Sequence, residues 1–494
     1  MKNGVKRILM AVMCLWAAIT VSSCSAPSQQ AARSSPTTLL IWHYYNGVQK
    51  QLFDQLVSRF NETVGEEMNI VVEAVNQGSI NELSQKTLDA LAHKVGAQPA
   101  PDVFAAYADT VYQASQQDKV VDISAYLTQA EKAEYVACYL HEGDLYNDGG
   151  LYIFPIAKAT EVLILNSTDW QRFALATGAQ ESDLATWEGI GRLAEAYYRW
   201  TDSLTETPED GKSFFGRDAM ANYLLVGCAQ LGKELFSVSG ENASLHADMK
   251  VMHRLWDYYY IPYINGYFAS FGRFRSDDVK TGDLIALVGS TSSAAYFPAE
   301  VTLADGSTYP IDAKVYPAPN FEGTAPFAVQ QGAGMAVIKS NPRTEAAAVT
   351  FLKWFTGREQ NEVFSGASGY LPVKKLPLED NAPESAWKAV ENPIVRDVLH
   401  VGQEMSQVYA LYTGKPFSGG SEARNILETS MQAKAAADRR LVLEQMAAGY
   451  TREEAVAHVN TKENFLQWYS SLVRQLELAT GLRPRESNPR FMVE

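Results

Sequence analysis

The feature that most constrains the fold is an alternation between short apolar segments and amphipathic segments with helical spacing. Between residues 49 and 62, for example, apolar side chains recur at helical intervals: Leu52, Phe53, Leu56, Val57 and Phe60. The strand-like segments of this region are 39–42, 70–72 and 102–107, and the helical ones are 49–62 and 81–92. Strands that alternate with helices predict a parallel sheet built of βαβ units.

The same alternation continues along the chain. Residues 160–165, 284–288 and 334–338 predict further strands, 344–355 predicts a helix, and 425–481 is mostly helical by composition. The length of 494 residues indicates two to four domains at about 100–200 residues each. With 46% hydrophobic and 20% charged residues, the composition excludes a disordered chain. The alternation of strands and helices predicts an α/β protein.

The N-terminus has the pattern of a bacterial lipoprotein signal. Lys2, Lys6 and Arg7 precede an apolar run at 8–19, which is too short to span a membrane. The stretch ending at Cys24 resembles a lipobox, in which the cysteine is lipidated and becomes the first residue after cleavage. We therefore predict a signal peptide at 1–23, and a lipidated cysteine with a flexible tether at 24–37. An ordinary secretory signal and a short anchor helix are the alternatives.

Charge and motifs exclude several classes of function. The formal net charge of −15 is opposite to what nucleic-acid binding requires, and no Cys/His cluster has zinc spacing. The sequence 211–213 ends like a phosphate-binding loop, but Glu206 stands where its first glycine should be. We predict no metal and no cofactor. Cys138 and Cys228 are read as two free thiols, although a disulfide between them stays open. A pair of carboxylates for glycoside hydrolysis also stays open.

Five segments, in order along the chain, resemble extracellular solute-binding proteins of ABC importers, of the carbohydrate type. The segments are 41–45, 101–103, 154–166, 331–340, and 347–356 together with 368–373. Within that family the chain looks most similar to the glycerol-3-phosphate-binding branch. It differs by an aliphatic pair at Ile164 and Leu165, where the family often has tyrosines, and by a longer helical C-terminal region.

The resemblance implies a two-lobe fold like that of type II periplasmic binding proteins, with strands that cross between the lobes at a hinge. One lobe would comprise 38–157 and 332–390, and the other 158–331 and 391–494. It further implies a monomeric, non-enzymatic protein that is anchored by lipid on Cys24 at the extracytoplasmic face of a membrane. This protein would capture a saccharide or polyol and present it to an ABC permease. Alternatives are a secreted glycan hydrolase, a binder of glycerol-3-phosphate or phosphodiesters, and a ligand sensor.

Ligands of open α/β sheets gather beyond the carboxyl ends of the strands, so polar and aromatic residues at such positions are candidates for ligand contact. The candidates are Tyr44, Tyr45, Ser79, Tyr107, Asp109, Thr160, Glu161, Arg273, Ser290, Ser292, Gln331, Gly332 and Tyr370. Tyrosine rings suit sugar faces, and hydroxyl and carboxyl groups suit sugar hydroxyls. Each also has a structural alternative: core packing for the tyrosines, a helix cap for Ser79, turn chemistry for the serines and Gly332, a buried structural partner for Glu161, and an exposed strand edge for Arg273 with Arg275.

Overall fold

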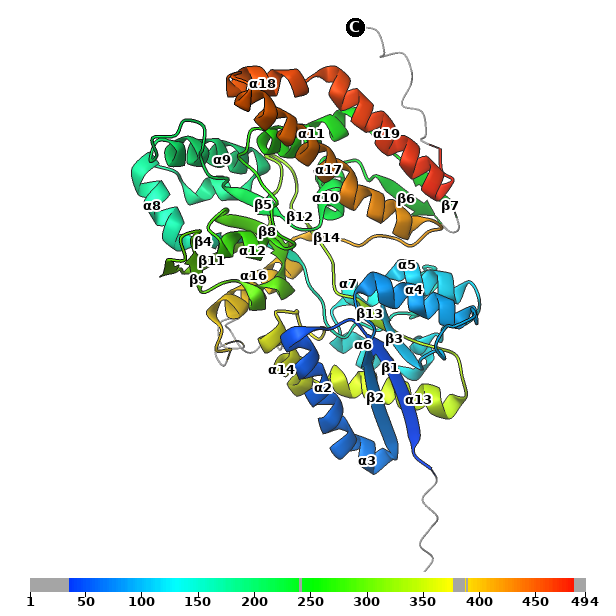
Figure 1. The fold of residues 1–494 in the computed structure, drawn as a ribbon. Coiled ribbons are helices and arrows are strands. Elements are labelled where there is room, and N and C mark those ends of the chain that lie inside the picture. Colours follow the sequence, from blue (N-terminus) through cyan, green and yellow to red (C-terminus); the bar gives the residue numbers. More distant parts are fainter. Residues whose placement is uncertain (1–34, 240–241, 376–386, 388–389, 484–494) are drawn as a thin grey trace, which may run out of the picture.

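The computed structural model describes residues 35–239, 242–375, 387 and 390–483, which form two α/β lobes stacked end to end (Figure 1). The predicted signal peptide and Cys24 lie outside the described residues. The α/β fold class with two lobes is confirmed. Among the helices described, none is long and apolar enough to cross a membrane.

Lobe 1, the lower lobe in Figure 1, is built on a four-stranded sheet of order β13-β3-β1-β2. Its core is rich in phenylalanine: the helix predicted around 49–62 places Phe53 and Phe60 against Phe351 and Phe355 of a later helix. The elements are β1 (Thr37–His43), α2 (Gly47–Glu62), α3 (Val64–Met68), β2 (Ile70–Asn76), α4 (Ile80–Leu91), β3 (Val103–Ala106), α5 (Ala108–Ser115), η1 (Ile123–Tyr126), α6 (Gln129–Glu134), α7 (Ala137–His141), β13 (Gly334–Val337), α13 (Pro342–Phe355) and α14 (Arg358–Ser368).

Lobe 2 is built on a second four-stranded sheet, of order β11-β4-β8-β5. Three two-stranded sheets accompany it: β9 with β10, β6 with β7, and β12 with β14. The elements are β4 (Glu161–Asn166), α8 (Ser167–Thr177), η2 (Glu181–Ala185), α9 (Trp187–Asp202), β5 (Phe215–Arg217), α10 (Met220–Gln230), β6 (Phe236–Ser239), β7 (Asn242–Leu245), α11 (Met249–Ile264), α12 (Arg275–Lys280), β8 (Ala286–Ser290), η3 (Thr291–Tyr296), β9 (Glu300–Thr302), β10 (Thr308–Pro310), β11 (Ala313–Pro317), β12 (Phe327–Val329), α16 (Pro393–Val408), β14 (Ala410–Tyr412), α17 (Gly420–Ala447), α18 (Arg452–Val459) and α19 (Lys462–Thr480).

Both main sheets are mixed, which corrects the prediction of parallel sheets. In lobe 1, β1 pairs in parallel with β2 and β3, but β13 runs antiparallel to β3. In lobe 2, β4 runs antiparallel to both β8 and β11. The exceptions, β13 and β4, are the strands that arrive directly from the other lobe. Each of these two strands begins at the end of its sheet that faces the other lobe. A strand of a βαβ unit begins at the opposite end, so β13 and β4 run in the reverse direction.

Three chain segments cross between the lobes and are hydrogen-bonded to one another. Ala159 and Gln331 exchange backbone hydrogen bonds of 2.9 and 2.8 Å, and the Lys158 amide donates to the Leu371 carbonyl at 3.0 Å. Gly332 lies at the centre of this junction with φ of +88°, and a Cβ there would stand 2.6 Å from the Ala157 carbonyl oxygen. Only glycine satisfies both the left-handed backbone and this close approach.

The helical C-terminal region covers lobe 2. The long helix α17 packs against α10, α11 and α19, and buries Leu427, Met431 and Ala435. These helices lie mainly on lobe 2 (Figure 1), and the start of α17 also reaches α5 of lobe 1. The two remaining thiols are free, with Cys138 half-buried in α7 of lobe 1 and Cys228 buried in α10 of lobe 2.

Candidate functional site

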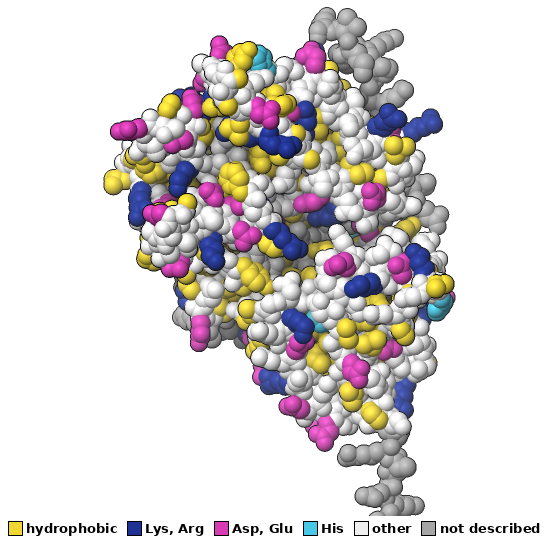
Figure 2. All heavy atoms as spheres, in the orientation of Figure 1, with side chains coloured by type: hydrophobic (Ala, Val, Ile, Leu, Met, Phe, Trp, Pro, Cys, Tyr) yellow, Lys and Arg dark blue, Asp and Glu magenta, His cyan; other side chains and the backbone are white. Residues whose placement is uncertain are grey.

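A cavity of about 730 Å³ lies between the lobes, where the amino end of α2 faces lobe 2. Figure 2 shows this face of the molecule hollowed between the two lobes, with acidic and basic side chains on both sides of the hollow. The cavity is within the size range of sites for small organic ligands, roughly 300–1,000 Å³. It is the candidate functional site.

Lobe 1 contributes amide side chains to this cavity. Asn46 and Gln49 stand at the start of α2, and the Gln49 amide lies 3.5 Å from the carbonyl oxygen of Ser292 in lobe 2. Gln331, on a crossing strand, also lines the cavity, and its Oε1 has no hydrogen-bond partner among the described residues. An amide oxygen that is buried without a partner is ready to accept from a ligand hydroxyl.

Lobe 2 contributes a row of hydroxyl groups. Ser290 ends β8, and its hydroxyl caps the following 3-10 helix and lies 2.9 Å from the hydroxyl of Ser292. Ser293 lies in the same turn, and Tyr296 at its end presents a 44% exposed ring. The chain therefore places hydroxyls and an aromatic face side by side, as a sugar ring requires.

Glu161 lines the cavity, but its negative charge is compensated by Arg217, which lies buried behind it. Both of its carboxylate oxygens lie 2.9 Å from the Arg217 guanidinium, and Asn222 donates to it at 2.8 Å. Arg217 in turn stacks over the rings of Trp187 and Tyr223. Fully buried opposite charges held this way position a carboxylate firmly, so Glu161 is a fixed acceptor at the edge of the cavity.

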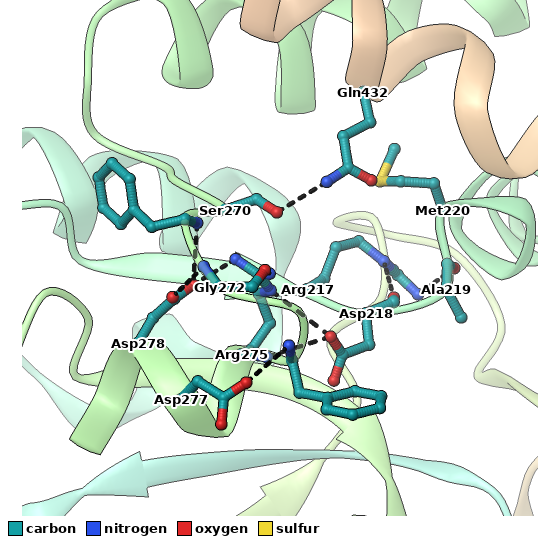
Figure 3. A network of polar contacts seen from close by, with 12 residues as sticks. Arg217, Asp218, Ala219, Met220, Ser270, Gly272, Arg275, Asp277, Asp278 and Gln432 are labelled. Atoms are coloured by element: carbon teal, nitrogen blue, oxygen red, sulfur yellow. Dashed lines mark hydrogen bonds and ion pairs between the residues drawn. The ribbon is translucent and has the colours of Figure 1, made fainter. Parts of the chain in front are cut away.

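Asp218 is the second carboxylate of the cavity wall, and a buried network holds it (Figure 3). The backbone amide of Arg275 donates to Asp218 Oδ1 at 3.2 Å, and the Arg275 Nε lies 3.5 Å from the same oxygen. Arg275 is also paired with buried Asp278, which accepts from the Gly272 amide at 2.6 Å. Burial raises the pKa of Asp218 to about 6, although Arg275 opposes the shift.

Four of the predicted residues line this cavity: Glu161, Ser290, Ser292 and Gln331. Three predicted tyrosines form a cluster beside it on lobe 1. The hydroxyls of Tyr44 and Tyr370 lie 3.2 Å apart, and Tyr107, which is 36% exposed, is close enough to influence the pKa of both. Burial raises the pKa of Tyr370 to about 12, so the phenol is neutral and can donate a hydrogen bond.

Other predicted residues lie elsewhere. Tyr45 is 1% exposed, and its ring packs against Phe53 and Phe364 in the core of lobe 1. Ser79 is exposed and forms a capping box with Glu82 at the start of α4. Asp109 lines a separate cavity of about 60 Å³ next to Arg424 at the start of α17, and burial raises its pKa to about 6.

Three predictions concern the junction and the rim. Thr160 is buried at the beginning of the crossing into β4, and its carbonyl accepts from the Thr291 amide at 2.8 Å. Gly332 is required by the packing of the crossing strands, as described above, rather than by an open approach to the cavity. Arg273 is exposed, with its guanidinium over the Phe274 ring. Arg275 is buried in the ion pairs of Figure 3, so the two arginines do not form a joint anion grip.

The sequence reading missed several lining residues. These are Asn46, Gln49, Asp218, Ala219, Phe274, Ser276, Asp277, Lys280, Ser293, Tyr296, Pro298, Ala299 and Glu300. Asp218 follows β5, which has only three residues and no recognisable strand pattern. Arg424 was also not predicted from the sequence. Its guanidinium donates to Asn222 at 2.7 Å and so joins α17 to the Glu161 network. Nothing in the local sequence signals that contact, because its partners are about 200 residues away.

Comparison with solved structures places the fold among two-lobe binding proteins. UgpB from Mycobacterium tuberculosis, solved in complex with glycerophosphocholine, is 18% identical with a TM-score of 0.62, and the match covers 90% of this chain and 98% of that one. The cyclic alpha-maltosyl-1,6-maltose binding protein from Arthrobacter globiformis is 16% identical with a TM-score of 0.60, covering 88% and 99%. The substrate-binding protein Lmo0181 from Listeria monocytogenes, in complex with cycloalternan, is 14% identical with a TM-score of 0.62, covering 91% and 100%.

No curated protein sequence matches the chain. A family profile does match, over residues 55–391, which is more than half of the chain, and its description is bacterial extracellular solute-binding protein. That family consists of binding proteins, which confirms the predictions of a non-enzymatic role and of an extracytoplasmic place of action. The chain therefore belongs to the bacterial extracellular solute-binding proteins.

Proposed function

We propose that this protein captures a neutral polyhydroxylated solute, in particular a saccharide, in the 730 Å³ cavity between its lobes. The lining chemistry carries the proposal. Serine hydroxyls, three amides and two fixed carboxylates provide donors and acceptors for sugar hydroxyls, while Tyr296 and Phe274 offer aromatic faces. Two of the structural neighbours were solved as binders of cyclic saccharides or with one bound.

The charge balance of the cavity argues against a phosphate monoester. Lys280 is the cationic side chain among the described lining residues, against the carboxylates of Asp218, Asp277, Glu300 and Glu161. Arg217 and Arg275 are already neutralised by buried acids. A dianion placed here would meet more negative than positive charge, whereas a neutral polyol would not.

A zwitterionic glycerophosphodiester is the second candidate. Lys280 lies in the same cavity as Asp218 and Asp277, so a ligand with one negative and one positive group could be matched. The likeness to the UgpB complex with glycerophosphocholine gives the same suggestion.

The protein's setting completes the proposal. We infer that lipid on Cys24 anchors the chain, that residues 24–37 tether it, and that the closed form is presented to an ABC permease. The proposed lobe boundaries are those given by the sequence, 38–157 with 332–390 and 158–331 with 391–494. Ligand contacts to both lobes would favour closure, because a ligand stabilises the form to which it binds better.

Titration calorimetry against neutral oligosaccharides, glycerophosphocholine and glycerol-3-phosphate tests the proposal. We expect saturable one-site binding of a neutral saccharide without turnover, and a loss of about tenfold in affinity for Gln331→Ala, since one good hydrogen bond is worth about 1 kcal/mol or slightly more. Ser307→Ala, on the exposed turn between β9 and β10, is the matched control. Binding of glycerophosphocholine alone would favour the second candidate. Binding of none of these would contradict both.

A further inference from the structure

A second cavity, of about 330 Å³, shares none of its described lining residues with the first. Gln331 faces the 730 Å³ cavity, and the neighbouring Gln330 faces the other way, as successive side chains of an extended strand do. The Gln330 amide donates to Glu142 at 2.9 Å, and Glu142 lines the second cavity. We call this second space the back cavity.

Both lobes form the wall of the back cavity. Lobe 1 provides Tyr112 of α5, α7 and the loop 142–147, and lobe 2 provides the hairpin around Val238 together with β14 and the loop that follows it. Much of the lining is aromatic or aliphatic. These residues are Tyr112, Leu145, Tyr146, Val238, Phe327, Leu411, Tyr412 and Pro416. The rings of Tyr112 and Tyr146 lie 6.0 Å apart and form one aromatic corner.

The polar part of the lining is rich in acceptors. Glu142 is paired with buried Lys158, and Asp144 accepts from two backbone amides at 3.0 and 3.2 Å. Glu234 has no ion pair within the described part of the chain, and it lies close enough to Tyr412 to raise the pKa of that phenol further than burial alone. Gln330 does not line the cavity itself, but its amide supports the Glu142 carboxylate from the crossing strand.

The charges of the lining therefore favour a cation. Three carboxylates face the cavity, against Lys415 at its edge and Lys158 behind Glu142. His141 also lines the cavity. Aromatic faces attract cations, and carboxylate and amide oxygens accept from ammonium N–H groups. A saccharide would leave the aromatic corner and the unpaired Glu234 without such a match.

We propose that the back cavity is a second ligand site, for a small organic cation that carries a primary ammonium on a compact apolar body. The ammonium would lie toward Glu234 and Asp144, and the body between Tyr112, Tyr146 and Tyr412. A cation bound in the back cavity would contact both lobes. It would therefore stabilise the arrangement in which the two lobes stay together at this cavity. The site is independent of the ligand proposed for the larger cavity.

Benzylamine and its neutral counterpart benzyl alcohol are the probes that test this inference. In titration calorimetry with the full-length protein, we expect benzylamine to bind with a dissociation constant below about 1 mM, at least about tenfold tighter than benzyl alcohol. Glu234→Gln should weaken benzylamine about fivefold or more, and Lys415→Met should strengthen it. Both side chains are exposed, so these variants should fold normally.

Tyr296→Ala, in the larger cavity, is the matched control and should leave benzylamine binding unchanged. Hydrogen exchange should slow on benzylamine binding in both 142–147 and 411–416, and not in 290–296. Equal binding of the alcohol would overturn the cation site, and so would no binding. Loss of affinity in Tyr296→Ala but not in Glu234→Gln would place the amine in the larger cavity and overturn it as well. Protection of one wall alone would contradict the bridging of the lobes.

Discussion

The two lobes line the same cavity with different chemistry. The residues that lobe 1 contributes, Asn46 and Gln49, are uncharged amides, whereas lobe 2 contributes five acidic or basic side chains. These are Glu161, Asp218, Asp277, Lys280 and Glu300. In the function proposed above, lobe 2 would orient the ligand through the fixed charges of Glu161 and Asp218, and lobe 1 would close over it with neutral hydrogen bonds.

The charges of lobe 2 are organised before a ligand arrives. Glu161 is held by Arg217, and Asp218 by Arg275, in networks that continue into the core of the lobe. Preorganised groups lose little freedom on binding, which favours affinity. The same arrangement makes the stability of lobe 2 depend on its site, and lobe 1 has no equivalent ion pair at the cavity among its described residues.

Breaking the Glu161 network should have the largest effect. Arg217→Met leaves Glu161 buried without its countercharge, and removal of one partner of a buried pair costs about 3–5 kcal/mol. The free energy of unfolding from urea titration measures this. Arg358→Met, which breaks an exposed ion pair on α14 of lobe 1, is the control and should cost less than about 1 kcal/mol. Equal losses in the two variants would contradict the contrast between the lobes.

The junction between the lobes should be next in sensitivity. Gly332→Ala forces a side chain toward the Ala157 carbonyl oxygen in a left-handed backbone, at a cost of about 1–3 kcal/mol. Gly178→Ala has a similar positive φ of +78° but meets open space, so it isolates the backbone strain. Thermal unfolding of both variants should show Gly332→Ala to be the less stable. The reverse order would mean that the crossing strands can move apart without loss.

The buried charge of Asp218 predicts a dependence on pH. Its pKa is raised to about 6, so between about pH 4 and 6 the folded protein holds this proton more tightly than the unfolded chain does. Stability from this group is therefore lost as pH rises through that window. We expect the Asp218→Asn variant to lose about 1–2 kcal/mol less stability over this pH range than the unmodified protein. The effect is limited to this size because 27% of the Asp218 side chain is exposed to solvent, which screens its charge.

Urea titrations at pH 4 and 6.5 measure the effect, with Asp305→Asn as the control. Asp305 lies on an exposed turn of lobe 2, and hydrogen bonds from Ser307 lower its pKa. Replacing Asp305 should not change the difference in the free energy of unfolding between pH 4 and pH 6.5. If the same difference were unchanged in Asp218→Asn, Arg275 would fully compensate the Asp218 carboxylate.

The neutral wall of lobe 1 should give the smallest effect. Gln49→Leu removes a 3.5 Å contact to the Ser292 carbonyl and one amide from the cavity, so we expect saccharide affinity to fall by less than about 1 kcal/mol. Asp218→Ala on lobe 2 should weaken the same ligand more, because hydrogen bonds to charged groups are stronger. A larger effect of Gln49→Leu would reverse the roles assigned to the lobes.

Local sequence determined much of the fold. The apolar spacing at 49–62 predicted α2, whose buried side chains include Phe53, Leu56, Val57 and Phe60. Ser79 followed by Glu82 forms the expected helix cap, and the strands near 39–42, 70–72 and 334–338 are confirmed. These features depend on neighbours within a few residues, where periodicity and capping act.

Tertiary structure decided the site. Tyr44 and Tyr45 are adjacent and their rings lie 5.0 Å apart, yet Tyr45 also packs against Phe53 and Phe364 and is buried in the core, because those two residues come from helices elsewhere in the sequence. Arg275 is neutralised by a buried acid, Asp278, and Glu161 is neutralised by Arg217, which is 56 residues away in the sequence. The sequence alone therefore determined the elements and the family resemblance. Only the tertiary structure decided which charges are neutralised and which groups meet in the cavity, because both depend on contacts between residues far apart in the chain.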